Sequence, residues 1–215
     1  MKVYEALTQA LVLEGMETFF GLMTNETVHL LNHVTKLGVP MVRSRTEGGA
    51  IGMADGYARA TGEPSIAIVG AGPGSTPTAT ALVTARNRRS PLVLIAGDTR
   101  PDAHPRKALD LASFYRTTAG HCAVVQGIET LAEDVHEAFG RVRRGEGPAV
   151  LVCSQEILEA GIVGTWEYEP REVSVRYPEP APEQLKEVAE ILLRAEKPVI
   201  LAGRGAASPS AREAL

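Results

Sequence analysis

Apolar residues along the chain alternate between the spacing of amphipathic helices and the unbroken runs of buried strands. In residues 2–14 the apolar positions fall three and four apart, which predicts a helix that Gly15 ends. Residues 50–58 repeat this spacing, and Gly62 follows them as a second stop signal. Each short apolar run predicts a strand that is buried on both faces of its sheet. These runs lie at residues 18–22, 40–43, 65–69, 91–96 and 148–153.

Helical segments separate the predicted strands. Asn25 is the expected N-cap of one helix, which places Val28 and Leu31 on a single face. Further helices are expected over residues 76–88 and 131–144. Short buried strands separated by helices of about ten or more residues are typical of parallel sheets that are covered on both faces. The sequence therefore predicts a doubly wound α/β domain with a mainly parallel sheet and helices on both faces.

The composition of the chain changes after Gly161. Four prolines stand among charged residues between residues 170 and 182, and this mixture is typical of a linker. An amphipathic helical pattern then begins near Leu185, and a further strand is expected over residues 198–202. Because so short a segment does not hold a core of its own, we expect it to open a second, truncated α/β domain. The predicted boundaries are 1–160 for the first domain, 161–182 for the linker and 183–215 for the beginning of the second domain.

Composition and charge exclude several classes of protein. Of the 215 residues, 44% are hydrophobic and 22% are charged, which is ordinary for a globular protein and too apolar for a disordered one. The net charge of −4 leaves no basic surface for a nucleic acid. No apolar run approaches the roughly 18 residues that span a bilayer, and the first residues lack the apolar core of a signal peptide. We therefore expect a soluble, cytoplasmic protein that binds neither nucleic acids nor membranes.

The cysteine and histidine residues give no sign of a disulfide framework or a metal site. Cys122 and Cys153 lack CxxC spacing, and Cys153 is expected to be a buried, unreactive thiol. His29 and His33 are placed at i and i+4 on a predicted helix, a spacing that can hold zinc, but no third ligand is evident. A solvated helix face is the favoured interpretation of this pair, and no metal ligand is expected in the chain.

The predicted strand at residues 65–69 runs into a glycine-rich turn, residues 70–74 (GAGPG), and then into a helix. This order is similar to the turn that binds dinucleotides at a helix N-terminus. The third glycine of that fingerprint would fall on Ser75, and the next strand-end acid, Asp98, lies beyond the usual distance of about 20 residues. A dinucleotide-binding oxidoreductase therefore stays as an alternative, beside a turn that needs glycine only for steric reasons.

Several motifs follow one another in a specific order. Residues 42–50 (VRSRTEGGA) lead into residues 53–62 (MADGYARATG); an apolar strand, residues 72–74 (GPG) and residues 91–98 (PLVLIAGD) come next. The ordered set resembles the N-terminal pyrimidine-binding domain of thiamine-diphosphate enzymes of the acetolactate synthase, pyruvate oxidase and benzoylformate decarboxylase group. In that family a glutamate at a strand end is followed by AxxMADGYAR, TG, a strand, GPG and PxxxIxG.

The resemblance, which extends from about Val3 to Cys153, implies roles for four residues. Glu47 matches the family's glutamate, whose carboxyl group hydrogen-bonds a ring nitrogen of the aminopyrimidine and favours the imino tautomer that removes the thiazolium proton. Gly72, Pro73 and Gly74 match the turn that lines the pyrimidine site. Without the later motifs, Glu47 would equally suit the first turn of a helix, where the dipole favours an acid by about 0.3–1 kcal/mol.

Four features depart from the family's pattern, and one of them is the absence of the Phe-Gln pair that is typical of acetolactate synthases and expected near residues 106–108. Thr46 stands where a histidine often precedes the glutamate, and Pro77 stands where an asparagine commonly follows the GPG turn. Of the GxPG motif in the family's first loop, only Gly21 is kept. In the family these positions face substrate or cofactor, so they leave the 2-oxo acid and the acceptor open.

The resemblance implies thiamine diphosphate with Mg²⁺ as the cofactor. The family binds the diphosphate through a magnesium ion held by a GDG motif and a later NN pair, and the sequence contains neither. The diphosphate and magnesium site is therefore expected outside this chain, in a diphosphate-binding domain of a missing C-terminal part or of another chain. Because the family's site forms between subunits, a homodimer or tetramer is implied. Whether a missing central domain holds a flavin is left open.

The resemblance thus implies the N-terminal part of an acetolactate synthase-like enzyme, which decarboxylates a 2-oxo acid and transfers the acyl carbanion to an acceptor. The chain is expected to be inactive alone. A non-catalytic regulatory or scaffold subunit with the same domain is the alternative from another class of protein. The dinucleotide-binding oxidoreductase is the third candidate.

Overall fold

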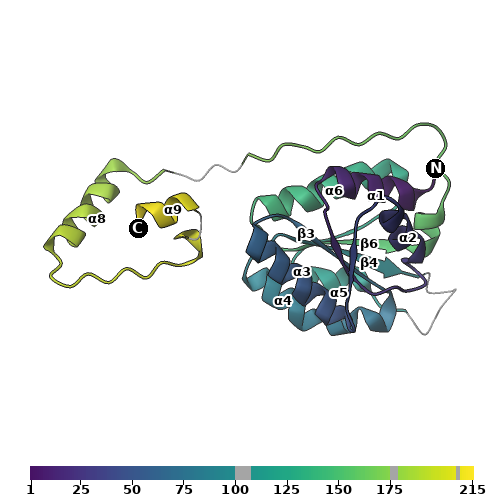
Figure 1. Ribbon diagram of the computed structural model, residues 1–215, viewed down its shortest axis with the longest axis horizontal. Helices are drawn as coiled ribbons and strands as arrows, with labels where there is room; N and C mark the ends of the chain where they lie inside the picture. The colour runs from purple at the N-terminus through teal and green to yellow at the C-terminus, as the bar shows by residue number, and fades with distance from the viewer. Residues whose placement is uncertain (100–107, 175–178, 207–208) are drawn as a thin grey trace. The chain divides into compact units, whose positions relative to one another are not determined.

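The computed structural model describes residues 1–99, 108–174, 179–206 and 209–215, and it divides into two units. The first unit spans Met1–Val175, and the second spans Arg176–Leu215. The first unit is a parallel sheet between two layers of helices (Figure 1), whereas the described part of the second contains helices and irregular segments. Part of the predicted linker lies outside the described residues.

Six strands form the sheet of the first unit, and every neighbouring pair is parallel. The strands are β1 (Phe19–Gly21), β2 (Met41–Arg43), β3 (Ser65–Val69), β4 (Leu92–Asp98), β5 (Cys122–Val124) and β6 (Ala149–Ser154). Their spatial order is β2-β1-β3-β4-β6-β5, so the order of the strands reverses between β1 and β3. Open α/β sheets bind ligands at the carboxyl ends of the strands where the order reverses. The predicted doubly wound parallel sheet is confirmed.

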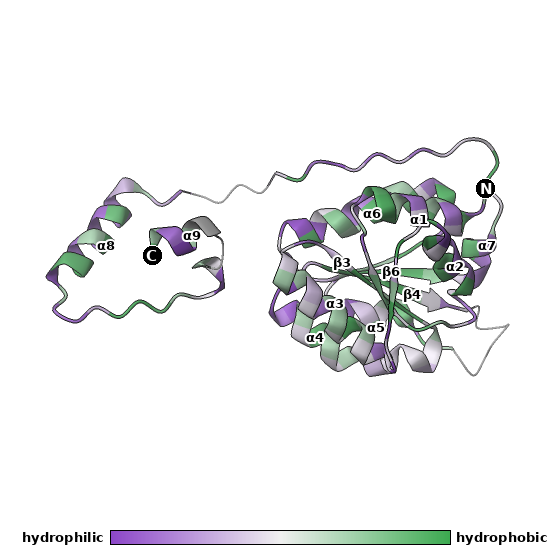
Figure 2. Cartoon of the chain, in the orientation of Figure 1, coloured by the Kyte–Doolittle hydropathy of each residue, from purple (hydrophilic) through white to green (hydrophobic). Residues whose placement is uncertain are grey.

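Helices cover both faces of the sheet (Figure 1). Along the central strand β3, Ile66 and Ile68 face one helix layer, whereas Ala67 and Val69 face the other. Because both faces are buried, the strand is an almost continuous apolar run, and Figure 2 shows hydrophobic residues concentrated along the strands. One layer contains α1 (Val3–Leu13), α2 (Val28–Lys36), α6 (Ile128–Arg143) and α7 (Gln155–Glu159); the other contains α3 (Glu47–Thr61), α4 (Ala79–Asn87) and α5 (Leu111–Thr118).

The structure differs from the predicted elements in two places of the first unit. The sequence pattern does not predict α5 or β5, and β5 is an edge strand in which only Cys122 is buried. The expected N-cap at Asn25 is wrong. Residues 25–27 form a turn in which the Thr27 amide donates to the Thr24 carbonyl oxygen over 3.2 Å, so α2 begins only after Thr27.

The segment that follows α7 packs against the first unit. Gly161 pairs with Lys2 in an antiparallel bridge. Tyr168 is buried, and its ring stacks on His136 of α6 with the centroids 4.5 Å apart. Trp166 stacks on Tyr168 in turn; Tyr168 belongs to the core cluster that includes residues of α1 and α6, and the partly buried Trp166 packs against that cluster. The contacts of the sheet domain therefore continue beyond residue 160, into the segment whose composition predicts a linker.

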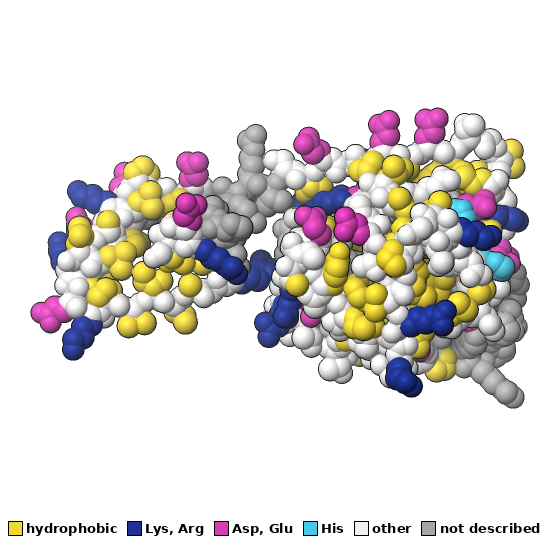
Figure 3. All heavy atoms as spheres, viewed as in Figure 1, with side chains coloured by type: hydrophobic (Ala, Val, Ile, Leu, Met, Phe, Trp, Pro, Cys, Tyr) yellow, Lys and Arg dark blue, Asp and Glu magenta, His cyan; other side chains and the backbone are white. Residues whose placement is uncertain are grey.

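The second unit contains the predicted amphipathic helix as α8 (Pro182–Arg194). Leu185 and Val188 of this helix are exposed, and Figure 3 shows apolar side chains at the surface of the unit. The strand expected over residues 198–202 is not formed, and Val199 and Leu201 are 93% and 96% exposed. A strand requires a neighbour to satisfy its backbone groups, and the described residues of this unit supply none. The elements of the unit are α8 (Pro182–Arg194), η4 (Arg204–Ala206) and α9 (Pro209–Ala214). Within the described ranges, no helix combines the length and apolar composition needed to cross a membrane.

Candidate active site

Three connecting segments lie at the edge of the sheet where the strand order reverses. They follow β1, β2 and β3, and they comprise residues 22–27, 44–46 and 70–78. The segment after β1 lies directly on the segment after β3, because a Cβ on Gly70 would stand only 2.7 Å from Thr24 Cγ2. Parallel strands bring their carboxyl ends to one edge, so side chains that are far apart in the sequence become neighbours here.

Glu47 is the first residue of α3. Thr46 caps this helix, since its Oγ1 accepts a hydrogen bond from the Gly49 amide over 3.1 Å. Glu47 is half-buried, and its Oε1 lies 3.0 Å from the position that a Cβ on Gly74 would occupy. The structure therefore brings Glu47 and Gly74 together, at a helix N-terminus whose dipole favours a carboxylate.

The predicted turn forms a 3₁₀ element, η1 (Gly72–Gly74). Gly72 is buried with φ of +58°, a left-handed conformation that favours glycine. Pro73 is exposed and Gly74 is half-buried. Hydrogen bonds hold the turn in shape: the Ser75 amide donates to the Gly72 carbonyl oxygen, and the Thr76 hydroxyl donates to the Pro73 carbonyl oxygen, each over 2.9 Å.

A tyrosine that sequence reasoning missed lies beside this turn. Tyr115 of α5 is fully buried, and its hydroxyl lies near the side chains of Ser75 and Thr78. Burial raises the pKa of Tyr115 to about 12, so the tyrosine is neutral at physiological pH. No motif marks this residue, and its helix was itself not predicted, so the sequence offered no signal for it.

Two acids lie close together at the carboxyl end of β4. Asp98 is the last residue of the strand, and its Oδ1 accepts a hydrogen bond from the Thr99 amide over 2.8 Å. Partial burial, together with the nearby negative charge of Glu26, raises the pKa of Asp98. Glu26 is buried, and its Cβ stands 2.9 Å from the position of a Cβ on Gly97. Asp98, the strand-end acid of the dinucleotide alternative, thus lies near a second acid, Glu26, which no sequence motif indicated.

The two histidines at i and i+4 have separate protein partners. His29 Nε2 lies 3.5 Å from Glu159 Oε1 of α7, whereas His33 Nδ1 lies 2.5 Å from Thr8 Oγ1 of α1. The pair therefore joins α2 to two neighbouring helices. Across the part of the chain that the structure describes, no group of three or more His, Cys, Asp or Glu side chains is arranged to hold a metal ion.

Both cysteines are free and buried. Burial raises the pKa of Cys122 to about 11, and it raises the pKa of the Cys153 thiol further. Cys153 is therefore a protonated, buried thiol, as predicted.

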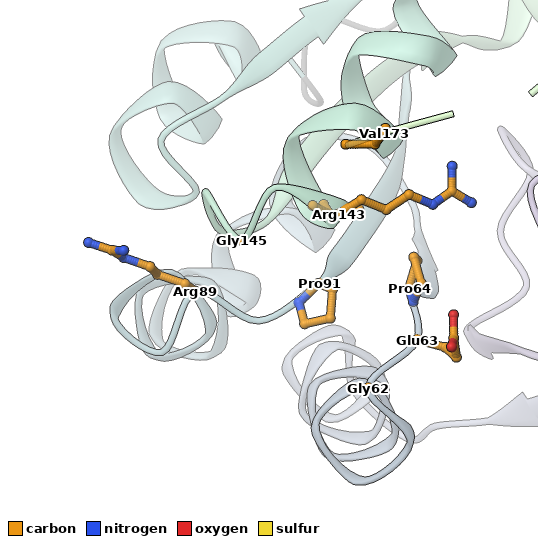
Figure 4. A pocket seen from close by; sticks show the side chains of 9 residues that line it. Gly62, Glu63, Pro64, Arg89, Pro91, Arg143, Gly145 and Val173 are labelled. Carbon is orange, nitrogen blue, oxygen red and sulfur yellow. The ribbon is translucent and has the colours of Figure 1, made fainter. Parts of the chain in front are cut away.

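A cavity of about 400 Å³ lies at the opposite edge of the sheet (Figure 4). Pro64 and Pro91, which line it, immediately precede β3 and β4, so the cavity is at the amino ends of the strands. Figure 4 shows the side chains of Arg89 and Arg143 pointing away from each other, so they do not form a joint site for an anion. The cavity does not belong to the edge where Glu47 lies.

Comparison with known proteins agrees with the sequence motifs. The sequence profile described as "Thiamine pyrophosphate enzyme, N-terminal TPP binding domain" matches residues 1–117. The chain is 29% identical over 220 residues to the acetolactate synthase large subunit of Haemophilus influenzae, an alignment that covers 98% of the chain and 38% of that protein. It is 27% identical over 242 residues to 2-hydroxyacyl-CoA lyase 2 of Mus musculus, covering 95% of the chain and 38% of that protein.

A solved structure with a similar fold is the thiamine diphosphate-dependent 4-hydroxybenzoylformate decarboxylase of Rhodococcus jostii RHA1. The TM-score is 0.76 at 22% sequence identity, over 93% of this chain and 38% of that protein. At 22% sequence identity this structural similarity shows the fold alone. The chain thus spans 38% of the length of each of these three proteins.

Proposed function

The chain belongs to the thiamine pyrophosphate enzyme family, and on this premise we propose that it is the N-terminal part of an acetolactate synthase-like enzyme. The whole enzyme decarboxylates a 2-oxo acid and transfers the resulting acyl group to an acceptor. The observation that carries the proposal is the position of Glu47, whose carboxylate lies beside Gly74 at the edge of the sheet that binds ligands in this fold class.

The residues at this edge fit the aminopyrimidine half of thiamine diphosphate. A side chain at residue 74 would occupy the space next to the Glu47 carboxylate, so glycine leaves that space open to a flat heteroaromatic ring. The helix N-terminus and the Thr46 cap hold the backbone of Glu47 in one position. The Glu47 side chain therefore starts from a fixed backbone position beside the space where a ring nitrogen would lie.

The chemistry that we assign to this chain is the placement of one proton, the one between Glu47 and a pyrimidine ring nitrogen of the cofactor. When bound, the cofactor supplies the acidic carbon of its thiazolium ring. The Glu47 carboxyl group would form a hydrogen bond with a pyrimidine ring nitrogen and so favour one tautomer of the ring. Gly72, Pro73 and Gly74 line the ring, and the hydrogen bonds within the turn keep them in place.

The diphosphate half of the cofactor requires a second site. Mg²⁺ binds through several converging oxygens, and the described residues contain no such cluster. We therefore propose that the diphosphate and Mg²⁺ are bound by the remainder of a longer protein or by another chain, and that the enzyme works as a homodimer or tetramer. The share of its relatives' length that the chain covers, 38%, supports this proposal.

Within the longer protein we propose residues 1–160 as the pyrimidine-binding domain, 161–182 as a linker whose first part packs on that domain, and 183–215 as the beginning of the central domain. The exposed apolar face of α8, which includes Leu185 and Val188, supports this division, because a fragment of a larger core leaves such a face uncovered. The two free cysteines are consistent with the reducing cytoplasm, which we propose as the location of the protein.

The replacement Glu47→Gln in the full-length protein tests this function. An amide does not donate an acidic proton to the ring, so exchange of the thiazolium proton of bound thiamine diphosphate with D₂O should slow by about 100-fold or more. The rate is measured by ¹H NMR after acid quenching. Glu63→Gln, which changes an exposed acid just after α3, is the matched control and should exchange like the wild type. Undiminished exchange in Glu47→Gln would remove this residue from the mechanism.

A further inference from the structure

Two glycines allow α3 and the segment after β3 to approach unusually closely. A Cβ on Gly48 would stand 2.8 Å from the carbonyl oxygen of Pro77, and a Cβ on Gly74 would stand 3.0 Å from Glu47 Oε1. Carbon and oxygen atoms that are not bonded normally stay roughly 3.3 Å or more apart. The first turn of α3 and the 3₁₀ turn η2 (Thr76–Thr78) are therefore closer than a side chain at residue 48 permits.

Neither side of this contact is free to move by itself. On the α3 side, the Thr46 cap and the hydrogen bond from the Ala50 amide to the Thr46 carbonyl oxygen, 3.0 Å long, hold the first turn. On the other side, the Thr78 hydroxyl donates to the Ser75 carbonyl oxygen over 2.5 Å, and the proline ring restricts φ at residue 77. An added methyl group would therefore displace one whole element relative to the other.

We propose that Gly48 is a positioning residue for Glu47, an inference that rests on the proposed function. The missing side chain at residue 48 lets the Pro77 carbonyl group approach the first turn of α3, and this approach sets the Glu47 carboxylate beside Gly74. In this role Gly48 acts through the neighbouring glutamate. Because catalysis loses about 100-fold for a misplacement of about 1 Å, a methyl group at residue 48 is expected to impair the proton transfer.

A pair of glycine-to-alanine replacements in one helix isolates this effect. Gly48→Ala places a methyl group against the Pro77 carbonyl oxygen. Gly52→Ala adds the same methyl group to the same helix, where no atom lies within 4 Å of it. Both changes introduce the better helix former, so any difference between the two variants reports on the contact with Pro77.

The first readout uses the full-length protein loaded with thiamine diphosphate and Mg²⁺. In Gly48→Ala the exchange of the thiazolium proton should slow by about 10- to 100-fold, while the dissociation constant of the cofactor stays within about threefold of the wild-type value. Gly52→Ala should match the wild type in both measurements. Wild-type exchange in a folded Gly48→Ala protein, or equal slowing in Gly52→Ala, would overturn the inference.

The second readout needs no cofactor. In the 215-residue chain with ¹³C-labelled glutamate side chains, the Glu47 carboxyl signal is assigned by its loss in Glu47→Gln. That signal should shift in Gly48→Ala and keep its position in Gly52→Ala. An unshifted signal in a folded Gly48→Ala chain would contradict the inference.

If Gly48→Ala does not fold, Thr78→Val decides, because it removes the hydroxyl whose hydrogen bond holds η2 in place against the first turn of α3. Slower exchange with intact cofactor binding supports the inference; wild-type exchange, or a loss caused only by failure to bind the cofactor, overturns it. Glu47→Gln separates the two proposals. Normal exchange in Glu47→Gln means that the proposed function fails. Slow exchange in Glu47→Gln together with normal exchange in Gly48→Ala means that only the role of Gly48 fails.

Discussion

Glu14 is a buried carboxylate whose charge is balanced by groups from distant parts of the chain. Its side chain is 1% exposed, and it accepts hydrogen bonds from the Arg143 guanidinium of α6 and from the Tyr168 hydroxyl. Arg143 also donates to the Glu14 carbonyl oxygen over 2.9 Å. A buried charge is tolerated only when it is paired in this way, so these three residues join α1, α6 and the segment after α7.

Tyr168→Phe should lower the free energy of unfolding by about 1–3 kcal/mol, because it removes a hydrogen bond to a buried charged group. Burial and the contact with Glu14 raise the pKa of Tyr168 in the folded state, so above about pH 10 the unfolded state loses the tyrosine proton first. The stability that the hydroxyl confers is therefore present below that pH and is lost as the pH rises above it. Urea unfolding at about pH 8 and about pH 10.5 measures both effects.

The matched control for this prediction is Tyr57→Phe. Tyr57 is half-buried, and its hydroxyl has no hydrogen-bond partner among the residues with described positions. Its replacement should change the free energy of unfolding by less than about 0.5 kcal/mol at either pH. Equal losses in the two variants, or a Tyr168→Phe loss that does not depend on pH, would show that the Tyr168 hydroxyl does not stabilise Glu14.

Single residues could be predicted from the sequence only where a local motif marks them. Glu47 lies inside an ordered set of motifs, and the structure brings it to the glycine turn of the same set. Asp55 and Arg59 follow from helical spacing, and their side chains are 3.7 Å apart, but the Ser90 hydroxyl that donates to Asp55 has no such signal. Tyr115 was missed for the same reason: its neighbours at the site come from another part of the chain.

At the scale of elements, burial on both faces decides what the sequence predicts. The strands β3, β4 and β6 are almost entirely buried and were located from their apolar runs. The edge strand β5 has one buried residue, so its three residues carry no periodic signal. The strand expected over residues 198–202 shows the opposite error, because an apolar run alone does not supply the neighbour that a strand requires.

The amide hydrogens of helix α8 should be much less protected from exchange with solvent than those of the long helix α6. Helix α8 has 13 residues and its side chains are exposed, and an isolated helix of that length is marginal in water. Its amide hydrogens should therefore exchange within about a second in the 215-residue chain, whereas those of β3 and β4 exchange orders of magnitude more slowly. Hydrogen–deuterium exchange with mass spectrometry measures this, with α6, which buries one face against the core, as the internal reference. Protection of α8 equal to that of α6 would contradict the prediction.

At the scale of the molecule, the sheet domain includes part of the segment that follows its last helix. Tyr168 completes the pairing of Glu14, and Trp166 covers Tyr168. Composition alone marks the proline-rich stretch as a linker, because the stacking partners of these aromatic residues lie far away in the sequence. The change in composition is visible in the sequence, whereas the contacts that residues after 160 make with the sheet domain are not.

Shortened chains test how far the stable domain extends. A chain that ends at residue 160 loses Trp166 and Tyr168, and it should unfold with a free energy about 3–6 kcal/mol lower than a chain that ends at residue 174, since it loses buried aromatic surface and one hydrogen bond to a buried charge. Urea titration followed by circular dichroism compares the two chains at one pH. Equal midpoints would show that residues 161–174 contribute nothing to the stability of the sheet domain.

Trp166 is the only tryptophan of the chain, and it stacks on Tyr168 with the rings 21° from parallel and their centroids 5.9 Å apart. Light absorbed at tryptophan wavelengths is therefore emitted from the segment that leaves the sheet domain, and not from the edge where Glu47 lies. The protein thus carries its own optical probe, whose emission follows the attachment of that segment to α6.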